Sequence, residues 1–198
     1  DNMQSIRMQG HVGLLAECTS CHATMPTSTN GGPHGLHPID AYWAKEHGDA
    51  AEHATAACKT CHGSDFRGTV LSRALGDRSL ATEKFGTKTF WRGFQISCYA
   101  CHDGPDSENA VRNRPAIASD ATGSTPAATA LTLGLTASDP DSNTLELRVV
   151  SQPAHGRAGI SGRTVTYIPD PAFSGSDSFT WSAWDGLTDS NLGRVTVA

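Results

Sequence analysis

Six cysteines and nine histidines are the residues of this 198-residue chain whose types and spacing suggest chemistry. The cysteines form three pairs with two residues between the sulfurs, and a histidine follows each pair directly. The motifs CTSCH, CKTCH and CYACH comprise Cys18, Cys21, His22, Cys58, Cys61, His62, Cys98, Cys101 and His102. In Cys-x-x-Cys-His, two thioether bonds can reach the vinyl groups of a porphyrin while the adjacent imidazole binds the iron. We therefore expect three haem c groups.

Other uses of Cys-x-x-Cys predict different chemistry. One such pair is half of a zinc site or a thioredoxin-like redox pair, and six cysteines can form a disulfide framework. None of these alternatives explains a histidine after every pair. Because haem is attached outside the cytoplasm, we expect an exported protein. The first ten residues, DNMQSIRMQG, do not resemble a signal peptide, so we expect this sequence to be the mature form.

Three haem irons would need three further ligands on their other faces. Five histidines outside the motifs precede residue 54, and four of them are our candidates: His11, His34, His37 and His47. Methionine is the rival ligand, and Met25 lies close to the first motif. Methionine ligation would raise the potential of that haem relative to two histidines. We expect histidine to serve at least three irons.

The elements that must hold these residues differ between the two halves of the chain. GGPHGLHP has the glycine and proline content of an irregular loop. DAYWAKEHGDAAEHATAA predicts a helix with Asp40 as its N-cap. Only 37% of the residues are hydrophobic, so haems would supply part of the interior. We predict a haem-packed, loop-rich, mostly α or irregular triheme cytochrome domain over residues 1–112.

Residues 113–198 follow a different pattern. From Leu131 onward, apolar side chains recur at every second position, in LTLGL, LELRV, VTY, FTW and VTV. Turn-forming segments such as SDPDSN, PAHGRAG and PDPAFSGSD separate these runs. Short alternating strands with glycine, proline and aspartate between them are typical of an antiparallel sandwich. We predict an all-β sandwich domain over residues 113–198.

Two function classes are disfavoured by composition. The formal net charge is -5 and the isoelectric point is about 5.9, which disfavours nucleic acid as a partner. The sequence contains no run of 18 or more apolar residues, so we expect no membrane span.

Both halves resemble known families. SDPDSNTLELRVVSQPAHGRAG, followed by VTYIPDPAFSGSDSFTWSAWDG, resembles the bacterial Ig-like, cadherin-like repeats of secreted and cell-surface proteins. That resemblance implies that His155 belongs to a structural turn. MQGHVGLLAECTSCH, GPHGLHP, WAKEH and CYACHDGP resemble extracellular multihaem cytochromes of metal-reducing bacteria. That resemblance implies that His11, His34, His37 and His47 are distal ligands, and some members of the class form haem-stacked filaments.

Three functions remain open at this point. The first is an extracellular electron conduit, with closely stacked, mainly bis-histidine haems and subunits that assemble into a filament. The second is a soluble electron shuttle in the periplasm or at the cell surface. The third is a haem reductase with an open iron site. The first two predict no catalysis, and their partners would be redox proteins, an extracellular electron acceptor or further copies of the chain.

Overall fold

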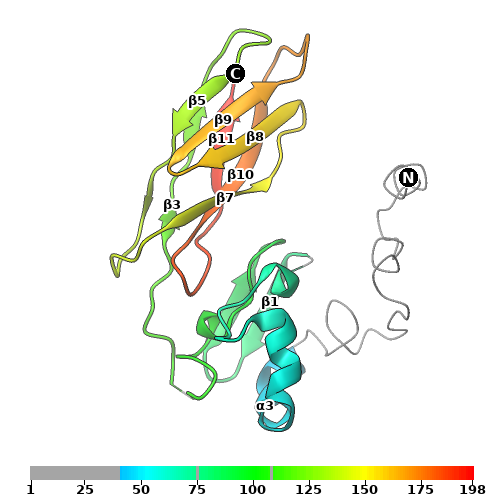
Figure 1. Ribbon diagram of the computed structural model, residues 1–198, viewed down its shortest axis with the longest axis vertical. Helices are drawn as coiled ribbons and strands as arrows, with labels where there is room; N and C mark the ends of the chain where they lie inside the picture. The colour runs from blue at the N-terminus through cyan, green and yellow to red at the C-terminus, as the bar shows by residue number, and fades with distance from the viewer. Residues whose placement is uncertain (1–40, 75, 108) are drawn as a thin grey trace, which may run out of the picture. The chain divides into compact units, whose positions relative to one another are not determined.

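The computed structural model describes residues 41–74, 76–107 and 109–198. The chain divides into two compact units, Asp1–Ala50 and Ala51–Ala198. Strands are the commonest regular structure among the described residues, and helices are few (Figure 1). The helices are α3 (Ala41–His62) and the short 3-10 helices η1 (Val70–Ser72) and η2 (Cys98–Ala100). The strands are β1 (Arg78–Thr82), β2 (Gly86–Phe90), β3 (Ile117–Ala118), β4 (Ala121–Gly123), β5 (Leu131–Gly134), β6 (Ala137–Ser138), β7 (Glu146–Ser151), β8 (Gly156–Ser161), β9 (Thr164–Pro169), β10 (Asp177–Trp184) and β11 (Gly193–Val197).

Helix α3 confirms the helix predicted before the second motif and extends further than expected. It continues through CKTCH and ends at His62. Gly63 follows with a φ of +84°, and its N–H donates to the carbonyl of Lys59 at 3.0 Å. A glycine in the left-handed region is a common helix terminator. The second motif therefore occupies the last helical turn.

The segment between the second and third motifs has a small core of its own. Strands β1 and β2 pair as an antiparallel hairpin. Ala74, Phe90 and Phe94 are buried together, and the rings of the two phenylalanines are 5.0 Å apart. Trp91 meets Phe94 edge to face at 5.4 Å. These aromatic side chains thus pack against each other.

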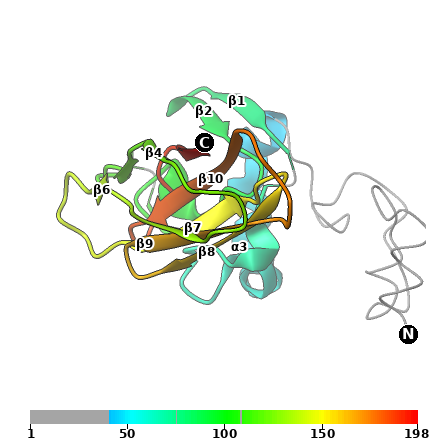
Figure 2. The ribbon, with the colours of Figure 1, turned by 90° about the horizontal axis from the view of Figure 1, so that it is seen from above.

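The C-terminal residues form two facing sheets (Figures 1 and 2). One sheet has the order β4-β11-β10-β7, and β4 is parallel to β11 while the other neighbours are antiparallel. The other sheet has the order β5-β9-β8 and is antiparallel. Strands β3 and β6 form a separate short pair. The alternating runs correctly predicted β5, β7, β9, β10 and β11, whereas β8 lies partly in a stretch that we expected to be a turn.

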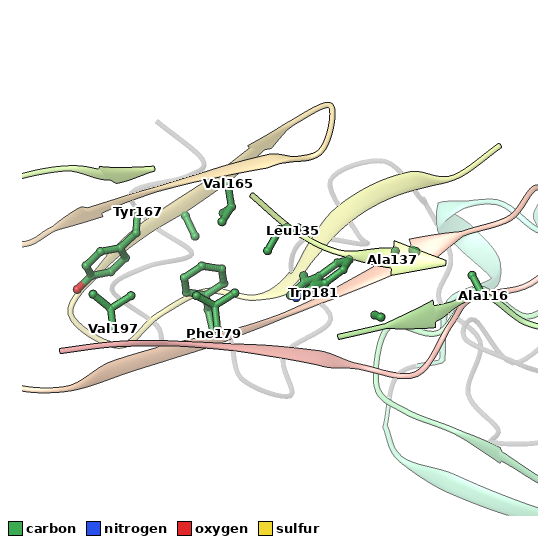
Figure 3. Close-up of a cluster of buried hydrophobic side chains, with 12 residues drawn as sticks. Ala116, Leu135, Ala137, Val165, Tyr167, Phe179, Trp181 and Val197 are labelled. Atoms are coloured by element: carbon green, nitrogen blue, oxygen red, sulfur yellow. The ribbon is translucent and has the colours of Figure 1, made fainter. Parts of the chain in front are cut away.

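The sandwich core consists of alternating side chains from both sheets (Figure 3). Val165 and Tyr167 on β9 point toward Phe179 and Trp181 on β10. Trp181 is 0% exposed and Phe179 is 2% exposed. Alternation along a strand puts every second side chain on one face, so the period-two pattern directly produces this core.

A buried carboxylate fixes the turn between β7 and β8. Asp177 accepts hydrogen bonds from the N–H groups of Ala154 and His155 and from the hydroxyl of Tyr167, at 3.0, 2.9 and 3.1 Å. Burial alone would raise the pKa of Asp177, but these hydrogen bonds and that of Ser178 outweigh it and lower the pKa. The His155 ring stacks on Phe173 at 4.2 Å. His155 lies in a structural turn of the sandwich, as its sequence context implies.

Gly193 gives a direct test of the sandwich packing. A Cβ atom at this position of β11 would lie 2.6 Å from Nε1 of Trp181 and 3.0 Å from the carbonyl oxygen of Ser119. Because Trp181 is fully buried, we expect Gly193→Ala to lower the free energy of unfolding by about 1–3 kcal/mol. Chemical denaturation measures this change. Gly159→Ala is the matched control, since no atom lies within 4 Å of the added Cβ in β8. An equal effect of both substitutions would contradict the packing.

Candidate functional site

The described residues contain two of the three predicted motifs. The second and third motifs and His47 are described. The other predicted site residues lie outside the described residues: His11, Cys18, Cys21, His22, His34 and His37. The site below is therefore built from the second and third motifs.

The second motif is held by the chain that follows it. The carbonyl of Cys61 accepts a hydrogen bond from the hydroxyl of Thr69 at 2.5 Å, and the carbonyl of His62 accepts one from the N–H of Gly68 at 2.8 Å. Nδ1 of His62 lies 3.2 Å from the carbonyl oxygen of Ile96. The last turn of α3 would otherwise leave carbonyls without partners, so these bonds fix both the motif and its imidazole.

The third motif forms the short helix η2 and the turn after it. The N–H groups of Cys101 and His102 both donate to the carbonyl of Cys98, at 3.2 and 3.1 Å. Nδ1 of His102 lies 2.6 Å from the carbonyl oxygen of Gly104. The ring of Phe85 lies 6.0 Å from the His102 ring. This motif is therefore ordered by its own backbone.

Both described motif imidazoles have the same hydrogen-bonding arrangement. His62 and His102 each place Nδ1 against a backbone carbonyl, which can only accept. The neutral imidazole then carries its proton on Nδ1 and its electron pair on Nε2. A carbonyl bonded to one ring nitrogen is also the usual means by which proteins orient a histidine whose other nitrogen donates electrons. Sequence spacing alone did not reveal these carbonyl partners.

The two motifs lie close together. The N–H of Cys98 donates to the carbonyl of Phe66 at 3.1 Å. Burial, followed by the proximity of Cys58 and Cys101, raises the pKa of Cys98 to about 11. Burial also raises the pKa of Cys101. Since the thiolate is the reactive form, these two thiols are poor nucleophiles at neutral pH.

His47 lies in α3, fifteen residues before His62 in the sequence. Its Nδ1 is 2.9 Å from the carbonyl oxygen of Ala44, and its ring centroid is 6.4 Å from that of Trp43. The contact with Trp43 follows from their spacing of about one helical turn, as the sequence indicated. Its role as a ligand remains a prediction.

The second half of the chain matches a known family. Residues 113–198 match the family model described as bacterial Ig domain. This part of the chain is a bacterial Ig-like domain. The assignment agrees with the two facing sheets and confirms the Ig-like part of the resemblance seen in the sequence.

Solved structures add little to this assignment. Two endo-fucoidan hydrolases from glycoside hydrolase family 107 align at TM-scores of 0.34 with 17% and 18% identity. The alignments cover 59% and 63% of this chain, but the chain spans only about a fifth of the hydrolases, 20% and 19%. The titin M3 domain aligns at a TM-score of 0.24 with 11% identity, over 41% of this chain and 90% of titin M3. Likenesses this weak carry no conclusion about activity.

Neither a curated relative of the chain nor a membrane-spanning helix among its described residues is found. A search of curated proteins found no match to this chain. In the described part of the chain, no helix has the length and apolar character needed to cross a membrane.

The prediction of three haem c cofactors is corrected by the structure. In residues 41–74, 76–107 and 109–198, no three or more histidine, cysteine, aspartate or glutamate side chains come together in a group that could hold a metal ion. The half-buried Cys101 instead packs against the cluster of Ala74, Phe90 and Phe94. No cofactor is therefore assigned. The haem-packed cytochrome fold predicted for residues 1–112 is likewise unsupported, because the described residues there form α3, a hairpin and short 3-10 helices.

Sequence reasoning missed how the Ig-like domain contacts the residues before the third motif. Arg148 on β7 and Asp189 in the loop after β10 form an ion pair at 2.6 Å, and the Asp189 side chain is 0% exposed. The N–H of Gln95 donates to the same carboxylate at 2.7 Å. Charged side chains are rarely buried unless they are paired, so this ion pair marks an important contact. The sequence does not reveal it, because Arg148 and Asp189 are 41 positions apart.

Proposed function

We propose that this chain is an exported electron-transfer protein whose Cys-x-x-Cys-His motifs are its redox sites. The observation that carries the proposal is the use of all six cysteines in three such motifs, each ending in histidine. The matching hydrogen bonds at Nδ1 of His62 and His102 support it, because they hold each imidazole in a fixed orientation beside its cysteine pair. The hydrogen bond from the N–H of Cys98 to the carbonyl of Phe66 supports electron exchange between neighbouring sites, because it joins the third motif to the chain just after the second.

The proposed setting is extracellular electron transport. Bacterial Ig-like domains are often found on cell surfaces, and residues 113–198 form one. We propose that copies of the chain assemble into an oligomer or filament and pass electrons to redox proteins or an extracellular acceptor. A soluble shuttle in the periplasm or at the cell surface is the alternative, and a reductase is the weaker one.

Voltammetry of the purified, exported chain tests the proposal. We expect reversible uptake and release of electrons. In the variant with Cys98→Ala and Cys101→Ala, the charge passed should fall by about one third, because one motif of three is lost. Thr60→Ala is the matched control, since it changes an exposed residue inside the second motif and keeps its cysteines and histidine.

Two results would overturn the electron-transfer proposal. One is the lack of any reversible signal in the unaltered protein, and the other is an unchanged signal in the double variant. Intact mass of the same sample identifies whether the cysteines are thiols, disulfides or covalently substituted. Light scattering and electron microscopy then distinguish the filament subunit from the soluble shuttle, because a filament subunit forms ordered polymers whereas a shuttle remains a monomer.

A further inference from the structure

The loop between β10 and β11 of the Ig-like domain contacts residues 91–97, the segment that leads into the third motif. The hydroxyl of Ser97 donates to the carbonyl of Leu187 at 2.6 Å. The indole N–H of Trp91 donates to the carbonyl of Ser190 at 3.2 Å. With the bond from Gln95 to Asp189, three residues of the segment are bonded to one loop. The Ig-like domain is therefore docked on this segment and is more than a tethered module.

Asp189 is the centre of this contact. Its carboxylate accepts from the N–H of Gln95 at 2.7 Å, from Nη2 of Arg148 at 2.6 Å and from the hydroxyl of Ser182 at 3.3 Å. Arg148 also donates to the carbonyl of Gly93 at 2.9 Å, and its guanidinium lies 5.1 Å from the Trp91 ring centroid. One buried ion pair thus binds the segment at three places.

The same segment positions both described motifs. The carbonyl of Ile96 lies 3.2 Å from Nδ1 of His62 and accepts from the hydroxyl of Ser72 at 2.9 Å. Ser97 is the N-cap of η2, and its carbonyl accepts from the N–H of Ala100 at 3.2 Å. Residues 95–97 therefore lie between the loop of the Ig-like domain and the two motifs.

We infer that the Ig-like domain positions the second and third motifs, with Asp189 as the positioning residue that acts through Gln95, Ile96 and Ser97. The functional consequence rests on the proposed electron transfer, but the positioning itself does not. Removal of the carboxylate leaves the N–H of Gln95 without its acceptor and Arg148 without its acidic partner. Residues 95–97 then lose their fixed position. As a result, the His62 ring and the first residues of the third motif are no longer held in place.

Hydrogen exchange on the full chain tests the inference. In Asp189→Ala, we expect the amides of Gln95, Ile96 and Cys98 to exchange at least tenfold faster, in conditions where the protein remains folded. Asp177→Ala is the matched control, because Asp177 is also a buried acid of the Ig-like domain but bonds only within that domain. It should leave these amides unchanged. Unchanged exchange in folded Asp189→Ala would overturn the inference.

A second variant and a second readout complete the test. If Asp189→Ala does not fold, Ser97→Ala removes only the bond to the carbonyl of Leu187 and should accelerate exchange at Cys98; no acceleration would overturn the inference. We also expect the midpoint potential of the motifs to shift in Asp189→Ala and not in Asp177→Ala. A potential that responds equally to both variants would reduce Asp189 to a general stability role. If no variant has a measurable potential, electron transfer fails while hydrogen exchange still decides the positioning.

Discussion

Replacement of Trp181 by alanine is expected to destabilise the Ig-like domain by about 3–5 kcal/mol. Trp181 is 0% exposed at the centre of the sandwich (Figure 3). Its removal costs the transfer free energy of a large ring and leaves a cavity that the neighbouring strands cannot fill. Since a domain of this size has a total stability of about 5–15 kcal/mol, this single change removes a large part of it.

Chemical denaturation followed by far-ultraviolet circular dichroism measures the effect, and hydrogen exchange assigns it to residues 113–198. Ile168→Ala is the control, because Ile168 is 57% exposed on β9 of the same domain. We expect a change within about 0.5 kcal/mol for a surface position of this kind. If both substitutions cost the same free energy, the sandwich core would not be the one described here.

Removal of the Arg148 side chain is the second large expected effect. Arg148→Ala leaves the carboxylate of Asp189 buried without its cation, and loss of one partner of a buried ion pair costs about 3–5 kcal/mol. Because the Arg148 side chain is 22% exposed, we expect a value near the lower end of that range, about 3 kcal/mol. Thermal or chemical unfolding at neutral pH measures it. Arg157→Ala, at an exposed position of β8, is the control.

The pH dependence of the Arg148→Ala variant gives a further check on its cause. Burial raises the pKa of Asp189 above its usual value even though Arg148 and hydrogen bonds act to lower it. A carboxyl group with a raised pKa in the folded state favours folding at low pH and loses that contribution as the pH rises through the folded pKa. Without Arg148 the pKa rises further. The loss in the free energy of unfolding caused by Arg148→Ala should therefore become smaller as the pH falls and Asp189 becomes neutral. A loss that does not depend on pH would contradict this explanation.

The Ig-like domain was largely predictable because its information is local. Val165 and Tyr167, or Phe179 and Trp181, are separated by one residue and so reveal their shared face directly. Strand β8 was missed because GRAGIS contains two glycines and resembles a turn. Its register is set by pairing with β9, which is a tertiary interaction that no window of sequence contains.

The candidate site was predictable in its residues and not in its arrangement. The spacing of Cys58, Cys61 and His62 marks the second motif without any structure. The carbonyl of Ile96 that orients His62 comes from 34 positions away, and every residue offers a carbonyl, so nothing in the sequence marks it. The interpretation of the motifs as three haem sites went beyond what spacing supports for the described residues, where no metal-holding group of side chains is found.

The short segment between Gln95 and Ser97 also implies a thermodynamic linkage between the motifs. Ile96 holds the imidazole of the second motif, and Ser97 is the N-cap of the short helix in the third. Any event at one motif that displaces this segment must alter the free energy of the corresponding event at the other, and the coupling is equal in both directions. We therefore expect an event that moves residues 95–97 at one of the two described motifs to affect the other motif as well.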